Sequence, residues 1–423
     1  MTDDLPELNY DSLQSESGRK LHRRIFGDSI SRDYAPRNNV SRLPPIPPPP
    51  RKYAQRPLEL LVREEQSKYQ PSLTKVVDFF YDQNVVDEEQ TGILAMLAAI
   101  HGLHIGIEGP AGSGKSHVVR AMQPLLPQEQ VYVLQLATDK AVFYDAGRIN
   151  KARFIIAPEL QKPVKDRNGS TIEVLKDLGE GKDAERIVTR SNGQVYHQVI
   201  YAKGKVIIYT LATENAFKKD AELGRRFVAL YTDTSPQHIQ NVLEESAARR
   251  LKGKQERKLS PEETQSLQNY VRYLIMLQGL EFRDPFALFM RQYIPQIPRA
   301  VSFVNHYDNF LNAMAKFHSN SRLRQGRYVF LSLEDHFLLF SLYHENFLEN
   351  LSAIAREEDK VVIRKVERDV NWQACLEAGV QMMHSHYPNL ALSWLEKQLQ
   401  EGSVSVIHPI TREKIEIAGA PCL

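Results

Sequence analysis

Eight consecutive residues of this 423-residue chain combine glycines, a lysine and a serine at a spacing that suits phosphate binding. The segment reads Gly109, Pro110, Ala111, Gly112, Ser113, Gly114, Lys115 and Ser116, which matches the pattern GxxxxGK[ST] at every fixed position. The glycines permit backbone conformations that turn several N–H groups toward one anion. Lys115 can place its charge on the β- and γ-phosphates, and Ser116 can offer its hydroxyl to Mg²⁺. The spacing therefore predicts a site for a nucleoside triphosphate and Mg²⁺.

A second group of candidates would act on the triphosphate. Glu159 follows the apolar run 154–157, and a carboxylate at the end of a core strand can orient the attacking water. Pro158 stands where such sites usually carry an aspartate that supports Mg²⁺. The metal would then depend on Ser116, the phosphates and water, because Mg²⁺ usually keeps several water ligands. Slower turnover and a substitute carboxylate such as Asp145 both remain open.

The polar end of the apolar run 206–213 supplies another candidate for the same step. The tip of this run would lie between the phosphate loop and Glu159, where a side chain can hold the attacking water. Asn215 is the first candidate for this role and Thr213 the second.

Two arginines, Arg225 and Arg226, stand just before the apolar run 227–231. They could form surface ion pairs, which are common and contribute little stability. Arg226 could instead reach the γ-phosphate bound to a neighbouring subunit, as an arginine finger does.

The elements that must position these residues follow from the hydrophobic pattern. Five short apolar runs predict interior parallel strands, which are buried on both faces. The predicted strands are 103–108, 131–136, 152–157, 206–213 and 227–231. Residues 116–126 predict a helix whose N-terminus faces the phosphates. The pattern therefore predicts an α/β fold with a doubly wound parallel sheet.

Composition divides the chain into four predicted regions. Residues 1–70 are polar and contain the proline-rich stretch 43–50, so we expect a disordered tail. Residues 71–235 begin with two predicted amphipathic helices and contain the α/β core. Residues 236–351 show helical periodicity, and residues 352–423 form a small, mostly helical region that ends in a predicted helix and hairpin. That ending fits either a winged-helix fragment or plain terminal packing.

Taken in order, these features resemble those of AAA+ ATPases. The shared order is the phosphate loop, an apolar strand ending in Glu159, a polar strand tip, and Leu-Gly-Arg-Arg-Phe at 223–227. The resemblance implies that Glu159 is the catalytic glutamate, Asn215 the sensor-one residue and Arg226 the arginine finger. It covers roughly residues 90–345 and implies a P-loop AAA+ core with an α-helical lid.

The region after residue 235 is similar to the lid of minichromosome-maintenance-type helicases. Arg299 precedes a predicted helix with an apolar face, and the resemblance implies that it is the sensor-two arginine, touching the nucleotide from the lid. Residues 332–335 by themselves predict a helix N-cap with acidic first-turn residues. Segments 138–144 and 179–182 also resemble helicase-like ATPases of phage and mobile-element replication.

A hairpin is predicted between Glu159 and the run 206–213, because Asn192-Gly193 is flanked by alternating residues. In helicase-type AAA+ proteins a hairpin at this place grips nucleic acid. Here Arg190 and Lys203 could meet phosphates, and Tyr196 could stack on a base. A structural hairpin on the outer surface is the open alternative.

Composition limits the other function classes. A net charge of +2 with 25% charged residues argues neither for nor against a nucleic-acid partner. Cys375 and Cys422 cannot form a zinc site by themselves, so a reducing, cytoplasmic setting is expected. No apolar run approaches the roughly 18 residues of a membrane span, so no membrane partner is expected.

The resemblance implies an ATP-hydrolysing motor or loader that acts on DNA, in replication of a chromosome, phage or mobile element, and that could be a DNA helicase. It also implies a homo-oligomeric ring, such as a hexamer, with ATP and Mg²⁺ as cofactors. Two alternatives stay open: an AAA+ chaperone that remodels a protein complex, and a non-hydrolysing ATP switch suggested by Pro158. The proline-rich tail could dock a further protein partner.

Overall fold

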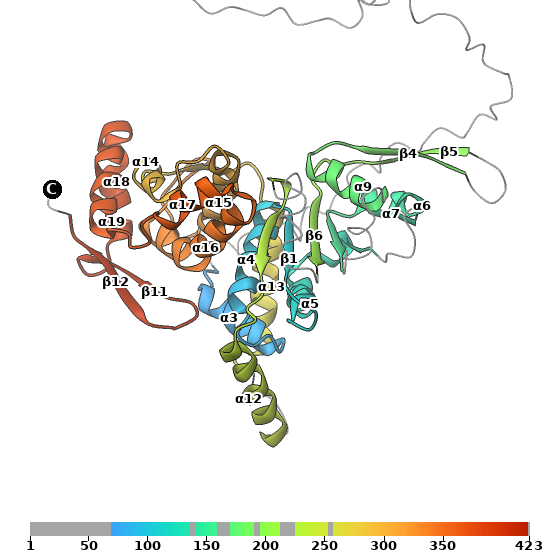
Figure 1. The fold of residues 1–423 in the computed structure, drawn as a ribbon. Helices are drawn as coiled ribbons and strands as arrows, with labels where there is room; N and C mark the ends of the chain where they lie inside the picture. The colour runs from blue at the N-terminus through green and yellow to red at the C-terminus, as the bar shows by residue number, and fades with distance from the viewer. Residues whose placement is uncertain are drawn as a thin grey trace, which may run out of the picture. The chain divides into compact units, whose positions relative to one another are not determined.

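A five-stranded parallel sheet lies at the centre of the computed structural model, which describes residues 69–134, 141–158, 170–189, 195–211, 225–252 and 257–421 (Figure 1). The strand order is β2-β3-β6-β1-β7, and every pair in it is parallel. The strands are β1 (Ile105–Glu108), β2 (Val131–Val133), β3 (Phe154–Ala157), β6 (Val206–Leu211) and β7 (Val228–Tyr231). All five strands predicted from the sequence are confirmed. The described residues belong to one compact unit, Pro57–Leu423.

Helices cover both faces of this sheet, because its strands are apolar on both sides. Ile105 and Ile107 of β1 join one hydrophobic core, whereas Gly106 between them faces Tyr209 and the second core. Helices of the first core are α3 (Leu73–Asp82), α4 (Glu89–His101), α5 (Lys115–Met122), α13 (Pro261–Met276) and α15 (Ala300–Phe317). Helices of the second core are α6 (Ala141–Tyr144), α7 (Ala146–Lys151) and α9 (Ser170–Gly179). The doubly wound α/β fold is confirmed.

Helix α4 differs from its prediction as an amphipathic helix. Residues 91–100 are buried without exception, so the helix has no polar face along most of its length. It lies inside the first core, where α3, α13 and α15 pack around it. The prediction was wrong because the sequence does not show how many neighbours a helix has.

Helices dominate the chain after β7, as the sequence predicted. They are α12 (Pro236–Lys252), α13, α14 (Ala287–Met290), α15, α16 (Leu333–Ile354), α17 (Glu357–Arg364), α18 (Trp372–His386) and α19 (Pro388–Gln398). A small sheet of β8 (Glu281–Arg283), β10 (Tyr328–Phe330) and β9 (Arg324–Gln325) escaped prediction. The predicted terminal hairpin is present as β11 (Ser403–Ile407) and β12 (Lys414–Gly419). None of the helices in the described ranges is both long and apolar enough to cross a membrane.

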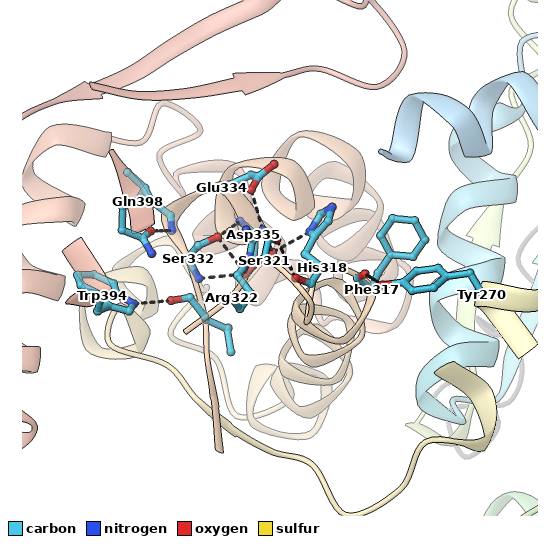
Figure 2. A network of polar contacts seen from close by, with 12 residues as sticks. Tyr270, Phe317, His318, Ser321, Arg322, Ser332, Glu334, Asp335, Trp394 and Gln398 are labelled. Carbon is cyan, nitrogen blue, oxygen red and sulfur yellow. Dashed lines mark hydrogen bonds and ion pairs between the residues drawn. The ribbon is translucent and has the colours of Figure 1, made fainter. Parts of the chain in front are cut away.

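A polar network fixes the start of α16 (Figure 2). Ser332 caps the helix and forms a capping box with Asp335, which confirms the N-cap predicted for 332–335. Arg322 donates two hydrogen bonds to the buried Asp335 carboxylate, at 2.6 and 2.9 Å. Gln398 Oε1 of α19 accepts from the Leu333 backbone N–H at 2.8 Å, so the network also joins α19 to α16.

Candidate functional site

The predicted phosphate loop, residues 109–114, connects β1 directly to α5. Gly114 caps α5 with φ 83°, a conformation that side chains with a Cβ rarely adopt. The first N–H groups of a helix have no partner within the helix, so the start of α5 can donate to an anion. The helix ends at Met122 and continues as the 3-10 turn Gln123–Leu125, which contains Pro124. The strand, loop and helix therefore follow in the required order.

Lys115 folds back over its own loop. Its side chain is buried, and its ammonium group donates to the Pro110 carbonyl oxygen and, at 3.2 Å, to Ser113 Oγ. These oxygens are acceptors of the kind that phosphate oxygens would replace. The ammonium group therefore already lies over the centre of the loop.

Thr232, the residue after β7, contacts the loop from the other side. Its hydroxyl lies 2.7 Å from Ser113 Oγ, and its backbone N–H donates to the Glu108 carbonyl oxygen at 3.1 Å. The loop is thus attached to the neighbouring strand as well as to its own helix.

Strand β6 lies between β1 and β3. The strands that precede the predicted catalytic residues are therefore close to β1, and their carboxyl ends point to the same side of the sheet. Strands β1 and β6 end level with each other, at Glu108 and Leu211, and β3 ends two residues earlier, because its last residue Ala157 is level with Tyr209. The end of β3 therefore lies two strand spacings, about 10 Å, to the side of β1, the strand that leads into the phosphate loop. Glu159, Thr213 and Asn215 themselves lie outside the described residues, and their roles stay predictions.

Asp145, the alternative carboxylate for Mg²⁺, lies elsewhere. Its Oδ2 accepts from the Tyr132 hydroxyl at 2.6 Å and pairs with Arg148 at 3.2 Å. Tyr132 belongs to β2, the edge strand three positions from β1, or about 14 Å. The structure therefore does not bring Asp145 to the phosphate loop.

A cavity of about 540 Å³ opens beside the start of the phosphate loop. This volume is within the range of small-molecule sites. Its walls come from the ends of β1 and β7, from the C-terminal part of α16 and from α17. The lining residues are Glu108, Gly109, Pro110, Tyr231, Thr232, Thr234, Glu349, Ser352, Ala353, Lys360 and Arg364.

Two cations of α17, Lys360 and Arg364, line this cavity, and neither was among the residues predicted for the site. Lys360 pairs with Glu357 of its own helix, and Arg364 is exposed. Because they are four residues apart in a helix, they share one face. Burial, reinforced by Glu345, raises the pKa of the Glu349 carboxyl across the cavity. The i, i+4 spacing of Lys360 and Arg364 is visible in the sequence, but only the fold shows which cavity these two side chains line.

Arg226, the predicted finger, is held within its own chain. Its guanidinium forms an ion pair with Glu180, and its side chain is 10% exposed. Glu180 also pairs with Lys182 at 2.8 Å. In this conformation Arg226 points to its own chain, so the finger role stays a prediction that requires the pair to open.

Arg299 does not line the cavity. It precedes α15, and this helix contacts residues that come before the amino ends of β7 and β1, whereas the phosphate loop follows the carboxyl end of β1. His306 Nε2 lies 2.9 Å from the Arg225 carbonyl oxygen before β7, and Lys316 Nζ donates to Ile100 O ahead of β1. Among the described contacts none joins Arg299 to the phosphate loop, and its sensor-two role stays a prediction.

The predicted hairpin is present as β4 (Ala184–Thr189) and β5 (Val195–Ile200), which pair antiparallel (Figure 1). Tyr196 pairs with Val188 near the tip, whereas Lys203 is exposed in the turn between β5 and β6. Seven residues of extended chain can separate these two side chains by roughly 20 Å. Arg190 lies outside the described residues. Tyr196 is therefore at the start of β5, and Lys203 is beyond its end.

One face of the hairpin carries exposed apolar side chains. Ile187 is 68% exposed and Val195 63% exposed. Ile187 pairs with His197, and Val195 lies two residues before His197 in β5, so the side chains of Ile187, Val195 and His197 share a face. His197 also lies 3.3 Å from the Glu185 carboxylate. Sequence reasoning missed this face because it read the hairpin for basic and aromatic residues.

Comparison with known proteins agrees with the sheet and the loop. A protein-family model described as "MTBMA_p00010 P-loop domain" matches residues 64–265. No curated protein matches the chain. The matched segment contains β1, the phosphate loop, α5 and the rest of the parallel sheet, so the chain contains a P-loop NTPase domain.

Proposed function

We propose that this protein is an ATP-hydrolysing AAA+ machine, a motor or loader that assembles as a homo-oligomeric ring and acts on DNA. The observation that carries the proposal is the position of β6 between β1 and β3. In this order the carboxyl ends of β3 and β6 lie on the side of the sheet from which the phosphate loop leaves β1, and this supports placing the residues that follow them near the bound triphosphate. Such convergence is what ATP hydrolysis needs, because a water-orienting group must lie close to the γ-phosphate.

The residues of this chain divide the work as follows. Lys115 and the N-terminus of α5 bind the triphosphate, and Glu159 with Asn215 orients the attacking water. Lys360 and Arg364 add positive charge from the other side of the cavity. Arg226 of a neighbouring subunit completes the site after it leaves Glu180.

Ser116, in the first turn of α5, would hold Mg²⁺ together with the phosphates. The ion supplies charge neutralisation on the phosphate oxygens when it is bound. The loop fits this ion, although Pro158 follows β3 where an aspartate would add a ligand through water. We therefore expect weak Mg²⁺ binding, visible as a high Mg²⁺ concentration at half-maximal turnover.

The β4–β5 hairpin is the proposed contact with DNA. Tyr196 is the second residue of β5, where a ring can stack on a base, and Arg190 follows β4 in the sequence. Lys203 would act separately, on phosphates near the base of the hairpin.

A second candidate, remodelling of a protein complex, is favoured by the exposed face of the same hairpin. Ile187 and Val195 offer apolar surface, and the His197 ring on the same face lies 3.3 Å from the Glu185 carboxylate. Apolar side chains suit a protein partner better than a phosphate backbone.

The test is ATP hydrolysis by the full chain with and without single- or double-stranded DNA, together with the native mass in ATP. Lys115→Ala should abolish nucleotide binding, and Glu159→Gln should retain binding and lose turnover about a hundredfold. A wild-type chain that binds ATP without turning it over would replace the motor by a switch. Absence of nucleotide binding would remove the proposal altogether.

Hairpin variants identify the substrate. Arg190→Ala with Tyr196→Ala should abolish stimulation by DNA, whereas Ile187→Ser with Val195→Ser should leave it intact. The second candidate would be favoured by two results together. ATP turnover would not change with DNA, and Ile187→Ser with Val195→Ser would abolish binding to a protein partner.

A further inference from the structure

Thr232 lies where the phosphate loop meets the cavity, but it belongs to neither the loop pattern nor the predicted catalytic group. Its hydroxyl oxygen lies 2.7 Å from Ser113 Oγ and 3.3 Å from the Glu108 carbonyl oxygen. A hydroxyl has one hydrogen to donate, and the Glu108 carbonyl oxygen can only accept. Thr232 therefore donates to Glu108, and Ser113 must donate to Thr232.

These assignments give a chain of hydrogen bonds with one direction. Lys115 Nζ donates to Ser113 Oγ, Ser113 donates to Thr232 Oγ1, and Thr232 donates to the carbonyl oxygen of Glu108. The chain begins at the cation that would meet the phosphates and ends on the backbone of β1. The only hydrogen of the Ser113 hydroxyl is used in the bond to Thr232, so this hydroxyl stabilises the loop. An anion would then be bound by the backbone N–H groups of the loop.

The contact between Ser113 and Thr232 also explains why the first residue of the loop, Gly109, has no side chain. A Cβ on Gly109 would lie 2.1 Å from Thr232 Oγ1 and 2.9 Å from Ser113 Oγ. Contacts this short are not possible without a shift of the backbone or of Thr232. Gly109 therefore makes room for the bond between Ser113 and Thr232.

We propose that Thr232 is the positioning residue of the phosphate loop, and that its hydroxyl holds Ser113 so that the loop is shaped for a triphosphate before the ligand arrives. This inference rests on the proposed function only in that the loop binds a nucleoside triphosphate. Preorganised donors bind an anion without an ordering cost at the moment of binding. Loss of the hydroxyl therefore weakens binding of the phosphates.

The test uses the full chain and two probes, a fluorescent ATP analogue and inorganic triphosphate as its competitor. Thr232→Val keeps the shape and removes the hydroxyl, and we expect both probes to bind about five- to tenfold more weakly. Thr232→Ser restores the hydroxyl and should bind as the wild type does. Ser113→Ala removes the other partner from a loop position, so it tests the same bond if the valine variant folds poorly. The double variant should be no weaker than either single one.

Thr411→Val is the matched control, because Thr411 is exposed between β11 and β12 and does not line the cavity. It should leave the affinity for inorganic triphosphate unchanged. Unchanged or tighter binding by Thr232→Val, or a serine variant as weak as the valine variant, would overturn the inference. These outcomes need a wild type that binds the ATP analogue; a wild type that does not bind it refutes the proposed function together with this inference.

Discussion

Arg226 and Glu180, 46 residues apart in the sequence, form an ion pair that leaves only 10% of the Arg226 side chain exposed. Arg225, its neighbour in the chain, is exposed instead. The residue proposed for a contact between subunits is therefore the covered one of the two. A finger role requires that nucleotide binding or assembly exchange Glu180 for a γ-phosphate, which carries more negative charge.

Mixing experiments distinguish a contact between subunits from a contact within one chain. We expect Arg226→Ala to bind the ATP analogue normally and to lose turnover at least about tenfold. Subunits with Lys115→Ala cannot bind nucleotide but still carry Arg226, so mixing the two inactive variants should restore part of the turnover. Arg225→Ala is the control and should remain active. Two inactive variants that stay inactive after mixing would limit Arg226 to its own chain.

The cations of α17 make a prediction about the charge of the ligand. Lys360→Ala and Arg364→Ala should each weaken binding of ATP about tenfold, and the effect should shrink as salt concentration rises. ADP should lose less, because it carries one phosphate fewer. Lys365→Ala is the matched control, since Lys365 follows Arg364 directly but does not line the cavity. If Lys365→Ala and Arg364→Ala weakened ATP binding equally, the effect would come from the net charge of the protein and not from a contact in the cavity.

The sheet could be predicted because each strand is a contiguous apolar run. The interior parallel strands β3 and β6 are buried at every position and carry a polar side chain only at Thr210, so their identity does not depend on distant neighbours. The small sheet formed by β8, β9 and β10 was missed for the opposite reason. Its strands are two or three residues long, so their pairing partners decide their structure and a sequence pattern cannot.

The site could be predicted only where its residues are neighbours in the sequence. The phosphate loop is one continuous segment, and the structure places it between β1 and α5 as expected. Thr232 and Arg364 reach the loop or its cavity from more than a hundred residues away. Nothing in their local sequence distinguishes them from an ordinary threonine and arginine. Their positions follow from packing of β7 and α17, which only the folded chain reveals.

Glu88 predicts a dependence of stability on pH. Burial raises the pKa of its carboxyl to about 7, although the Thr91 hydroxyl and the Asp233 N–H donate to it. Asp87 and His238 also lie in this cluster. Between pH 4.5, the ordinary value, and pH 7 the unfolded chain loses this proton while the folded chain keeps it. The free energy of unfolding therefore falls across this window, by up to about 3 kcal/mol, and the loss is complete above pH 7.

Glu88→Gln removes this titration and keeps an oxygen that can accept from Asp233. Urea unfolding at pH 5 and pH 8 should show the variant gaining stability relative to the wild type by up to about 3 kcal/mol at the higher pH. Glu396→Gln, an exposed position on α19, should show no such change. A difference that is the same at both pH values would contradict the assignment.

Two arginine–carboxylate pairs in the helical region after β7, Arg322–Asp335 and Arg291–Asp308, should differ in stability because they differ in burial. Arg322 holds Asp335 in two hydrogen bonds where the carboxylate is fully buried (Figure 2). Burial alone would raise the pKa of Asp335, but Arg322 and then His318 outweigh it and hold the pKa well below its usual range. Arg291 and Asp308 form a pair of the same two-bond geometry, with more than a third of each side chain exposed.

Arg322→Met would leave the Asp335 carboxylate buried without its guanidinium, in contact with His318 Nδ1 and the Ser332 N–H at 3.0 Å. We expect a loss of about 3 to 5 kcal/mol in the free energy of unfolding, since a buried charge without its partner is strongly destabilising. Asp335→Asn should cost less, because Arg322 keeps Glu334 at 2.7 Å. Arg291→Met should cost at most about 1 kcal/mol, because water solvates the Asp308 that it leaves. Urea unfolding at pH 7 measures all three, and equal losses for Arg322→Met and Arg291→Met would show that burial does not decide the strength of these pairs.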